Sequence, residues 1–324
     1  MDISGHSPAN RDGVVVVGSA NMDLVVNCER FPDPGETLLA RRFDMFPGGK
    51  GANQAVACAR LGSTVHFIGK MGDDVFRDQL VKSLGENGVN LERLKIDPIA
   101  PTGIAVITVD SSGQNQIIVS SGSNMSLRPD EVEEEADVLA HAKVVLLQLE
   151  VPLDTVERSA RLAKEGGATV ILNPAPAAPL SDSLLGFVDL ITPNMGELEV
   201  IAGVPVRGVR DVEGAARTLV GRGVDCVVVT MGEQGALSIT AEKSHLFQAR
   251  RVDAVDTTAA GDAFNGALAH SLAAGHPLDK GIELANAVAA YAVTKPGAQP
   301  SMPTMHELQL SFAGASADAG KKQN

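Results

Sequence analysis

The sequence contains no tryptophan and one tyrosine, and aromatic residues make up 3% of its 324 residues. Basic residues are also few: 27 lysines and arginines stand against 40 aspartates and glutamates, so the formal net charge is -13. Proteins that bind nucleic acid need a basic surface and rings on which bases stack, and anionic membranes attract basic segments. The composition therefore argues against both nucleic acid and membranes as partners.

Cysteines and long apolar runs are scarce as well. Cys28, Cys58 and Cys226 lie far apart and form no CxxC pair or cluster with histidine, so we expect neither a disulfide framework nor a structural zinc site. No apolar run approaches the roughly 18 residues of a membrane span, and Met1–Asp12 lacks the apolar core of a signal peptide. We therefore expect buried, reduced thiols and a cytoplasmic protein.

Several common phosphate and catalytic motifs are missing. The chain has no GxxxxGK[ST] loop, and Gly18 is followed by Ser19-Ala20-Asn21 where a dinucleotide-binding fingerprint would continue. The histidines form neither HxH nor HExxH, and no GxSxG sequence is present. These absences argue against a Walker-type nucleotide site, a nicotinamide-dependent oxidoreductase, a zinc protease and an α/β-hydrolase.

Short aliphatic runs alternate along the chain with amphipathic segments. The runs are Val14–Val17, Val65–Ile68, Val144–Leu147, Thr169–Leu172, Leu190–Thr192 and Cys226–Thr230. The helical patterns are Asn53–Leu61, Val75–Asn87, Asp154–Glu165, Val212–Arg222, Gly261–Ala274 and Leu278–Val293. This alternation predicts an α/β fold, a doubly wound and mostly parallel sheet flanked by helices, with the ligand site at the carboxyl ends of the strands.

Two extended stretches interrupt the alternation, at about residues 22–47 and 102–122. The second is typical of a hairpin, with strands at Gly103–Val109 and Gln116–Ser120. We expect the two inserts to form a small separate β-sheet, a lid over the site; the alternative is an extension at the edge of the main sheet. The rest of residues 13–313 would form one domain, with disordered segments at 1–12 and 314–324.

Two clusters join glycines or other small residues to charged side chains. Pro47–Gln54 (PGGKGANQ) is either a turn followed by a helix that Asn53 caps, or a loop in which Lys50 and Asn53 hydrogen-bond a small polar ligand. In Asp256–Phe264, free amides at a helix start would bind an anion. Asp262 in its first turn is either a plain helix cap or a general base beside a transferring phosphoryl group.

Two further clusters follow predicted strands. In Thr192–Glu197, Asn194 and Glu197 have the spacing of a capping box, and the same pair could order hydrated Mg²⁺ near phosphates. Thr230–Gly235 is a glycine-rich turn between two strands, which turn chemistry alone explains, or a backbone that a nucleotide approaches.

Together the clusters resemble the ribokinase family of carbohydrate kinases, the PfkB group, from Val14 to about Pro303. Asp256–Gly266 (DTTAAGDAFNG) is similar to the family's C-terminal signature, and Pro47–Asn53 (PGGKGAN) to its N-terminal signature. Shorter pieces are most similar to members that phosphorylate D-ribose. They are Gly18–Asp23 (GSANMD), Pro34–Thr37 (PGET), Gln148–Glu150 (QLE), Asn173–Ala177 (NPAPA), Ile191–Asn194 (ITPN) and Gly297–Pro300 (GAQP).

The resemblance implies that the chain transfers phosphate from ATP to O5 of D-ribose. Asp262 would be the general base, and the amides of Ala259, Ala260 and Gly261 would form the anion hole. The residues implied to hold the sugar hydroxyls are Asp23, Gly49, Lys50, Asn53, Glu150 and Asp262. Those implied to contact the nucleotide are Asn194, Thr230, Gly232, Glu233, Gln234, Gly235, Gly261 and, at the adenine, Asn286.

The resemblance also implies Mg²⁺ and a monovalent cation, usually K⁺. Asn194 and Glu197 would help place Mg²⁺ indirectly. The K⁺ ligands would be mostly backbone carbonyls, at Asp256 and Thr258 on one loop and at Ala292, Lys295, Gly297 and Ser301 on another. The family's β lid forms a dimer, so a homodimer through the lid is implied here. Ala259 stands where the usual GAGD signature has its first glycine, and its backbone amide would still serve.

Three alternatives stay open. Another kinase on this fold would act on 2-deoxyribose, fructose or a nucleoside, whose base could contact Met45, Ala105 and Ile107 in the lid. A non-catalytic sugar sensor would be expected to lack Asp262 or Gly261, and both are present. A nicotinamide-dependent oxidoreductase fits the strand–helix alternation but not the motifs. Because rings are scarce, we expect adenine to lie in a slot of aliphatic and small residues.

Overall fold

The computed structural model describes residues 13–311, and the predicted disordered segments 1–12 and 314–324 lie outside this range. A nine-stranded sheet forms the centre, in the order β15-β14-β13-β12-β11-β10-β1-β4-β6. Its strands are β1 (Val14–Val17), β4 (Val65–Ile68), β6 (Val89–Asn90), β10 (Val144–Leu147), β11 (Thr169–Leu172), β12 (Leu190–Ile191), β13 (Cys226–Thr230), β14 (Ala236–Ile239) and β15 (Ser244–Phe247). Neighbours pair in parallel from β6 to β13, and β14 and β15 are antiparallel. The predicted fold class is confirmed.

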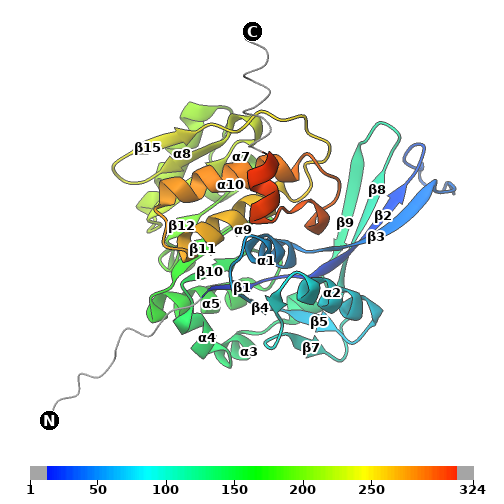
Figure 1. The fold of residues 1–324 in the computed structure, drawn as a ribbon, viewed down its shortest axis with the longest axis horizontal. Coiled ribbons are helices and arrows are strands. Elements are labelled where there is room, and N and C mark those ends of the chain that lie inside the picture. The colour runs from blue at the N-terminus through cyan, green and yellow to red at the C-terminus, as the bar shows by residue number, and fades with distance from the viewer. Residues whose placement is uncertain (1–12, 312–324) are drawn as a thin grey trace, which may run out of the picture.

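Helices cover both faces of this sheet (Figure 1). The four valines of β1 are fully buried, and because side chains alternate along a strand, Val14 and Val16 face one core while Val15 and Val17 face the other. The first core lies under α1 (Lys50–Arg60), α2 (Val75–Glu86), α9 (Ala260–Ala273) and α10 (Leu278–Ala292). The second lies under α3 (Pro129–Glu133), α4 (Ala136–His141), α5 (Leu153–Gly166), α6 (Asp182–Leu185), α7 (Met195–Ala202) and α8 (Val209–Gly221).

The helix-rich end of the chain packs into the first core. Within residues 13–311, no helix combines the length and the hydrophobicity that crossing a membrane requires. The remaining elements are short: the 3-10 turns η1 (Gly122–Ser126), η2 (Gly232–Gln234) and η3 (Gln299–Ser301), a two-stranded sheet of β5 (Lys70–Gly72) and β7 (Lys95–Asp97), and a final helical segment at 305–311.

The two inserts form a separate four-stranded sheet in the order β3-β2-β8-β9, which extends to one side of the body (Figure 1). Its strands are β2 (Asn21–Asn27), β3 (Arg42–Gly48), β8 (Gly103–Val109) and β9 (Asn115–Ser120). β2 pairs with β8 in parallel and with β3 antiparallel. The predicted lid sheet is therefore confirmed, and the alternative of an edge extension of the main sheet is wrong.

One buried side chain ties the base of the lid to the body. Asn124 in η1 accepts a hydrogen bond from the Ala20 amide at 3.0 Å and donates to Ala20 O at 3.2 Å and Asn21 Oδ1 at 2.7 Å. Gly103 begins β8 against this cluster, where a Cβ atom would lie 2.2 Å from Asn21 Oδ1. Both inserts are thus anchored at one point next to the sheet's carboxyl edge.

Candidate active site

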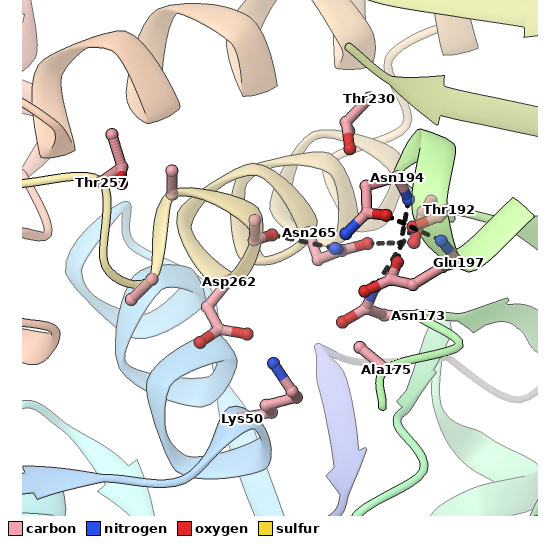
Figure 2. Close-up of a pocket in the computed structure, with 13 residues that line it drawn as sticks. Lys50, Asn173, Ala175, Thr192, Asn194, Glu197, Thr230, Thr257, Asp262 and Asn265 are labelled. Atoms are coloured by element: carbon pink, nitrogen blue, oxygen red, sulfur yellow. Dashed lines mark hydrogen bonds between the residues drawn. The ribbon is translucent and has the colours of Figure 1, made fainter. Parts of the chain in front are cut away.

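A polar residue follows each of several parallel strands at the carboxyl edge of the sheet: Gln148 after β10, Asn173 after β11 and Thr192 after β12. A pocket of about 180 Å³ opens there, between this edge and the start of α9 (Figure 2). Its lining residues are Lys50, Asn173, Ala175, Thr192, Asn194, Glu197, Thr230, Thr257, Ala259, Ala260, Gly261, Asp262 and Asn265. The structure thus places the pocket at the edge that the strand–helix pattern predicts.

The N-terminus of α9 forms one wall of the pocket. The N-cap residue of α9 is Ala259, which has φ 59°. Within residues 13–311 it is the single residue other than glycine whose φ is positive. No side chain caps the helix, and the first amides of a helix have no partner within it. The Ala260 amide donates a long hydrogen bond of 3.3 Å to Thr257 O in the preceding turn. This wall therefore presents backbone N–H groups and the positive end of the helix dipole to the pocket.

Asp262 lies in the first turn of α9 and is 6% exposed. Its two carboxylate oxygens accept hydrogen bonds from consecutive residues of α1: Asn53 Nδ2 donates to Oδ2 and Gln54 Nε2 to Oδ1, both at 2.9 Å. Burial raises the pKa of Asp262, while Lys50 and the two amides act to lower it. Since Asp262 bonds to α1 and not to its own helix start, interpreting it as a plain helix cap is wrong.

Lys50 extends its ammonium group toward Asp262 at the pocket (Figure 2), and four carboxyl groups act on its charge. Burial acts to lower the pKa of Lys50, but Asp262, Glu150, Glu197 and Asp23 together raise it. The lysine is therefore a fixed cation at the pocket, held charged by the acidic groups around it.

Glu150 and Asp23 bring acceptor oxygens close to Lys50. Glu150 Oε2 accepts hydrogen bonds from Ser19 Oγ at 2.5 Å and from the Lys50 amide at 3.1 Å. Burial, followed by the charges of Glu150 and Asp262, raises the pKa of Asp23 from 3.8 to about 7. Two carboxylates and one ammonium group thus converge from β2, α1 and the segment after β10.

The glycines of the PGGKG loop serve contacts within the protein. A Cβ atom at Gly48 would lie 2.3 Å from Asp23 Oδ2, one at Gly49 2.6 Å from the Asn21 amide nitrogen, and one at Gly51 2.7 Å from the Ser19 amide nitrogen. Gly49 also has φ 89°. The loop can therefore press against β2 and the turn before it, which sets Lys50 at the first position of α1. Asn53 lies inside this helix and does not cap it.

Asn194 and Glu197 form the predicted capping box at the start of α7. Asn194 Oδ1 accepts from the Glu197 amide, and Glu197 Oε2 accepts from the Asn194 amide, each at 2.8 Å. Both residues also line the pocket, and burial raises the pKa of Glu197. Among residues 13–311, no three His, Cys, Asp or Glu side chains gather closely enough to hold a metal ion by themselves.

The turn after β13 lies beside the pocket. Thr230 is a lining residue, and its amide donates to Pro193 O at 2.9 Å. Gly232, Glu233 and Gln234 form η2, with positive φ at Gly232 and at Gly235. Asn286 is buried in α10 and is not among the residues that line the pocket. Its Nδ2 donates to Phe247 O at 3.1 Å, which commits one of its amide hydrogens to the protein.

The two loops predicted to hold a monovalent cation lie side by side. Asp256 accepts from the Thr258 amide through Oδ1 and from the Gly297 amide through Oδ2, each at 2.9 Å. Ala292 ends α10, and its carbonyl accepts from the Lys295 amide at 3.1 Å. The Lys295 ammonium group is engaged by Tyr291 and Glu307. Ser301 Oγ donates to Ala298 O at 2.7 Å, which leaves its lone pairs free to accept.

Several polar residues at the site received no role from the sequence. Gln54, Gln148 and Asn173 form an amide chain beneath Asp262. Thr192 Oγ1 donates to Asn265 Oδ1 at 2.6 Å, and Asn265 Nδ2 donates to Gly261 O at 2.9 Å. A signal existed for three of these residues: each directly follows a buried parallel strand, where polar side chains are otherwise unexpected.

Comparison with known proteins defines the class. The model of the pfkB family carbohydrate kinases matches residues 11–305, and the chain belongs to this family. It is 40% identical to a ribokinase of Haemophilus influenzae over 92% of this chain and 97% of that protein. It is 39% identical to a deoxyribokinase of Salmonella typhi, over 91% of this chain and 97% of the relative.

A solved structure is similar over nearly the same span. The ribokinase of Arabidopsis thaliana, complexed with ribose and ATP, superposes with a TM-score of 0.88 at 33% identity, covering 92% of this chain and 98% of that one. The chain is therefore a sugar kinase that transfers phosphate to an alcohol group.

Proposed function

We propose that the protein is an ATP-dependent kinase that converts D-ribose to D-ribose 5-phosphate. The observation that carries the proposal is the position of Asp262, a buried carboxylate in the first turn of α9 that faces the same pocket as the amides of residues 259–261. A base and an anion-binding helix start within one turn are what phosphoryl transfer to a hydroxyl requires. The ribokinases among the relatives support ribose as the acceptor.

In the proposed reaction, Asp262 accepts the proton of the ribose O5 hydroxyl. The O5 oxygen bonds to the γ-phosphorus while the bond from that phosphorus to the β–γ bridging oxygen breaks, and ADP leaves with that electron pair. The amides of Ala259, Ala260 and Gly261 stabilise the charge of the transferring phosphoryl group. Burial suits Asp262 to the task because it raises the pKa of this carboxyl toward the pH at which the enzyme works.

The sugar would lie between β2 and the start of α1. Asp23 and Glu150 accept hydrogen bonds from hydroxyls, Lys50 donates one, and Gly49 lets the backbone come close. Asn53 adds an acceptor: its Oδ1 is buried and has no partner within the part of the chain that the structure describes. A buried, unpaired oxygen is costly unless a ligand supplies a donor, which supports a polyol here.

The nucleotide would extend from the α9 terminus across the end of the sheet. Asn194 and Thr230 would face its phosphates, and residues 232–235 its ribose. Asn286 would approach the adenine with its remaining amide groups. Gly261 would serve both the nucleotide site and the anion hole, since its amide would bind the γ-phosphate that is transferred.

Two metal ions fit the residues present. Mg²⁺ would arrive on ATP and supply positive charge at the β- and γ-phosphates, with Glu197 and Asn194 holding it through water; the absence of a three-carboxylate cluster in residues 13–311 agrees with an ion held mainly by phosphate. K⁺ would bind the carbonyl-rich loops that Asp256 joins, at Thr258, Ala292, Lys295, Gly297 and Ser301. There it would fix the loop that leads into α9.

We also propose a homodimer through the lid and a cytoplasmic location. The outer strand β9 is exposed along its whole length, including Ile117 at 54%, Ile118 at 72% and Val119 at 49%, and Phe43 on β3 is exposed at 55%. Such an apolar strand edge favours burial against a second copy. The three cysteines are free and buried, which suits a reducing compartment that supplies ATP.

A coupled assay for ADP release tests the proposal. ATP, Mg²⁺ and K⁺ are supplied with D-ribose, 2-deoxyribose, fructose or adenosine, and the order of kcat/KM identifies the acceptor. We expect the highest value for D-ribose and a lower rate when Na⁺ replaces K⁺. Because the deoxyribokinase relative is almost as similar as the ribokinase, 2-deoxyribose is the second candidate, and a higher kcat/KM for it would overturn the choice of ribose.

A further inference from the structure

Gln54 is a fully buried side chain in the second turn of α1 whose hydrogen-bonding groups are all engaged. Its Nε2 donates to Asp262 Oδ1 at 2.9 Å and to Asn173 Oδ1 at 3.0 Å, and its Oε1 accepts from Gln148 Nε2 at 2.7 Å. A carboxylate can only accept, so the amide group must turn its N–H toward Asp262. The donor from Gln148 locks Oε1 on the opposite side.

Gln148 is held by close packing and by its bond to Gln54. It is fully buried at the end of β10; its Oε1 has no hydrogen-bond partner among the described residues and packs against Gly18, where a Cβ atom would lie 2.0 Å from it. Neither amide can rotate without losing a buried hydrogen bond. The chain Gln148–Gln54–Asp262 therefore transmits the fixed position of the central sheet to the carboxylate on α9.

Neutral donors suit the oxygens of a base. Each hydrogen bond stabilises the ionised carboxylate against the cost of burial, and neither amide can take the proton itself. The charged groups that face Asp262 come from other elements: Lys50 from α1, Glu150 after β10, Asp23 from β2 and Glu197 from α7. Of these four groups, Lys50 alone favours the ionised form of Asp262, and the other three are carboxylates that disfavour it. The side-chain amides that donate to Asp262 therefore act in the same direction as Lys50.

We propose that Gln54 is a positioning residue that fixes the orientation of the Asp262 carboxylate and keeps it ionised, and this inference rests on the proposed role of Asp262 as the base. Asn53 holds the other oxygen but also offers its free carbonyl to the sugar. Gln54 has no group left for substrate, so its contribution is confined to the base.

The test is Gln54→Met, which keeps the length and burial of the side chain and removes its donors. In the D-ribose assay we expect kcat to fall about 10- to 100-fold, as for the loss of a hydrogen bond to a charged group, with KM for ribose changed by no more than about two-fold. The acidic limb of the pH profile should move to higher pH, because the ionised form loses a donor. An unchanged kcat and pH profile would overturn the proposal.

A matched control is Thr155→Val on α5. Thr155 is fully buried in the other core, and its Oγ1 donates to Leu127 O at 2.7 Å. This variant loses one buried hydrogen bond away from the site, against the three that Q54M loses, so we expect a smaller drop in unfolding midpoint and an unchanged kcat and pH profile. Equal effects of Q54M and T155V on the pH profile would show that Gln54 is merely structural.

A second measurement separates this inference from the proposed function. The ¹³C resonance of the Asp262 carboxyl, assigned by its loss in Asp262→Asn, is titrated in the free protein without substrate. We expect a higher midpoint in Q54M than in the unsubstituted protein, whether or not that protein phosphorylates ribose; equal midpoints overturn the inference. Should Q54M fail to fold, Gln54→Leu takes its place because it also removes both donors, and an unchanged midpoint there has the same consequence.

Discussion

The crossing of α1 and α9 brings Asn53 and Gln54 to Asp262, and Gly266 permits it. A Cβ atom at Gly266 would lie 2.4 Å from Ala57 Cβ and 2.8 Å from Gln54 O, well inside ordinary contact at 3.4–4 Å. Alanine at this position would force the helices apart by about 1 Å, since both neighbours are rigid parts of α1. Overpacking of this kind costs about 1–3 kcal/mol.

The matched variant is Gly214→Ala in α8, where a Cβ atom would meet nothing within 4 Å. Both substitutions gain the same helix propensity, about 1 kcal/mol, so the difference between their free energies of unfolding isolates the overpacking. We expect G214A to be more stable than the unsubstituted protein by about 0.5–1 kcal/mol and G266A to be less stable than G214A by about 1–3 kcal/mol.

Urea unfolding followed by circular dichroism measures both changes, with equal m-values as the check that each transition stays comparable. The kinase assay adds a second readout, because displacement of α1 from α9 should also lower kcat in G266A but not in G214A. If G266A proves as stable and as active as G214A, the close crossing does not set the geometry of the base.

Three further predictions concern the site itself. Asp262→Asn should lower kcat by about 10²- to 10⁴-fold while ribose binding stays detectable by calorimetry; near-full activity would remove Asp262 from the role of base. The fold raises the pKa of Asp23 from 3.8 to about 7. The contribution of this carboxyl to the free energy of unfolding is therefore fully present below about pH 4 and is lost as the pH rises through 7. Urea unfolding should show that Asp23→Asn is more stable than the unsubstituted protein at pH 8 but not at pH 4, and the variant should bind sugar more weakly. Ala259→Gly should relieve the strain of a positive φ and raise the unfolding temperature, with kcat nearly unchanged because the amide remains; a lower unfolding temperature would show that the strain is absent.

The strands and helices of the central layer were predictable because their signals are local. A run such as Val14–Val17, apolar on both faces, is typical of a parallel sheet covered by helices, and the hairpin turn before Asn115 has its own sequence signature. The two inserts were expected to form one sheet, but the antiparallel strand β15 and the parallel register of β2 with β8 were not predicted. They depend on which edges lie together after folding, and β2 and β8 are far apart in sequence.

The site was predicted unevenly for the same reason. The first turn of α9 and the capping box of Asn194 are read from a few adjacent residues, and the structure has both. The partner of Asp262 was missed: Gln54 follows Asn53 in an apolar helix, and its spacing is that of an ordinary core-facing position. Asn53 and Asp262 were both assigned to the sugar, but no contact between them was predicted, and the hydrogen bond that joins them spans 209 positions of the chain.

That separation bears on when the enzyme becomes active during its synthesis. Lys50, Glu150 and Asn194 leave the ribosome long before Thr257–Asp262, and the turn that carries both the proposed base and the amides proposed to bind phosphate belongs to one of the last helices to be made. A nascent chain that ends before α9 lacks the proposed base and the proposed wall for the phosphate, and its α1 lacks the helix against which it packs. Phosphoryl transfer should therefore begin only when α9 has docked on α1.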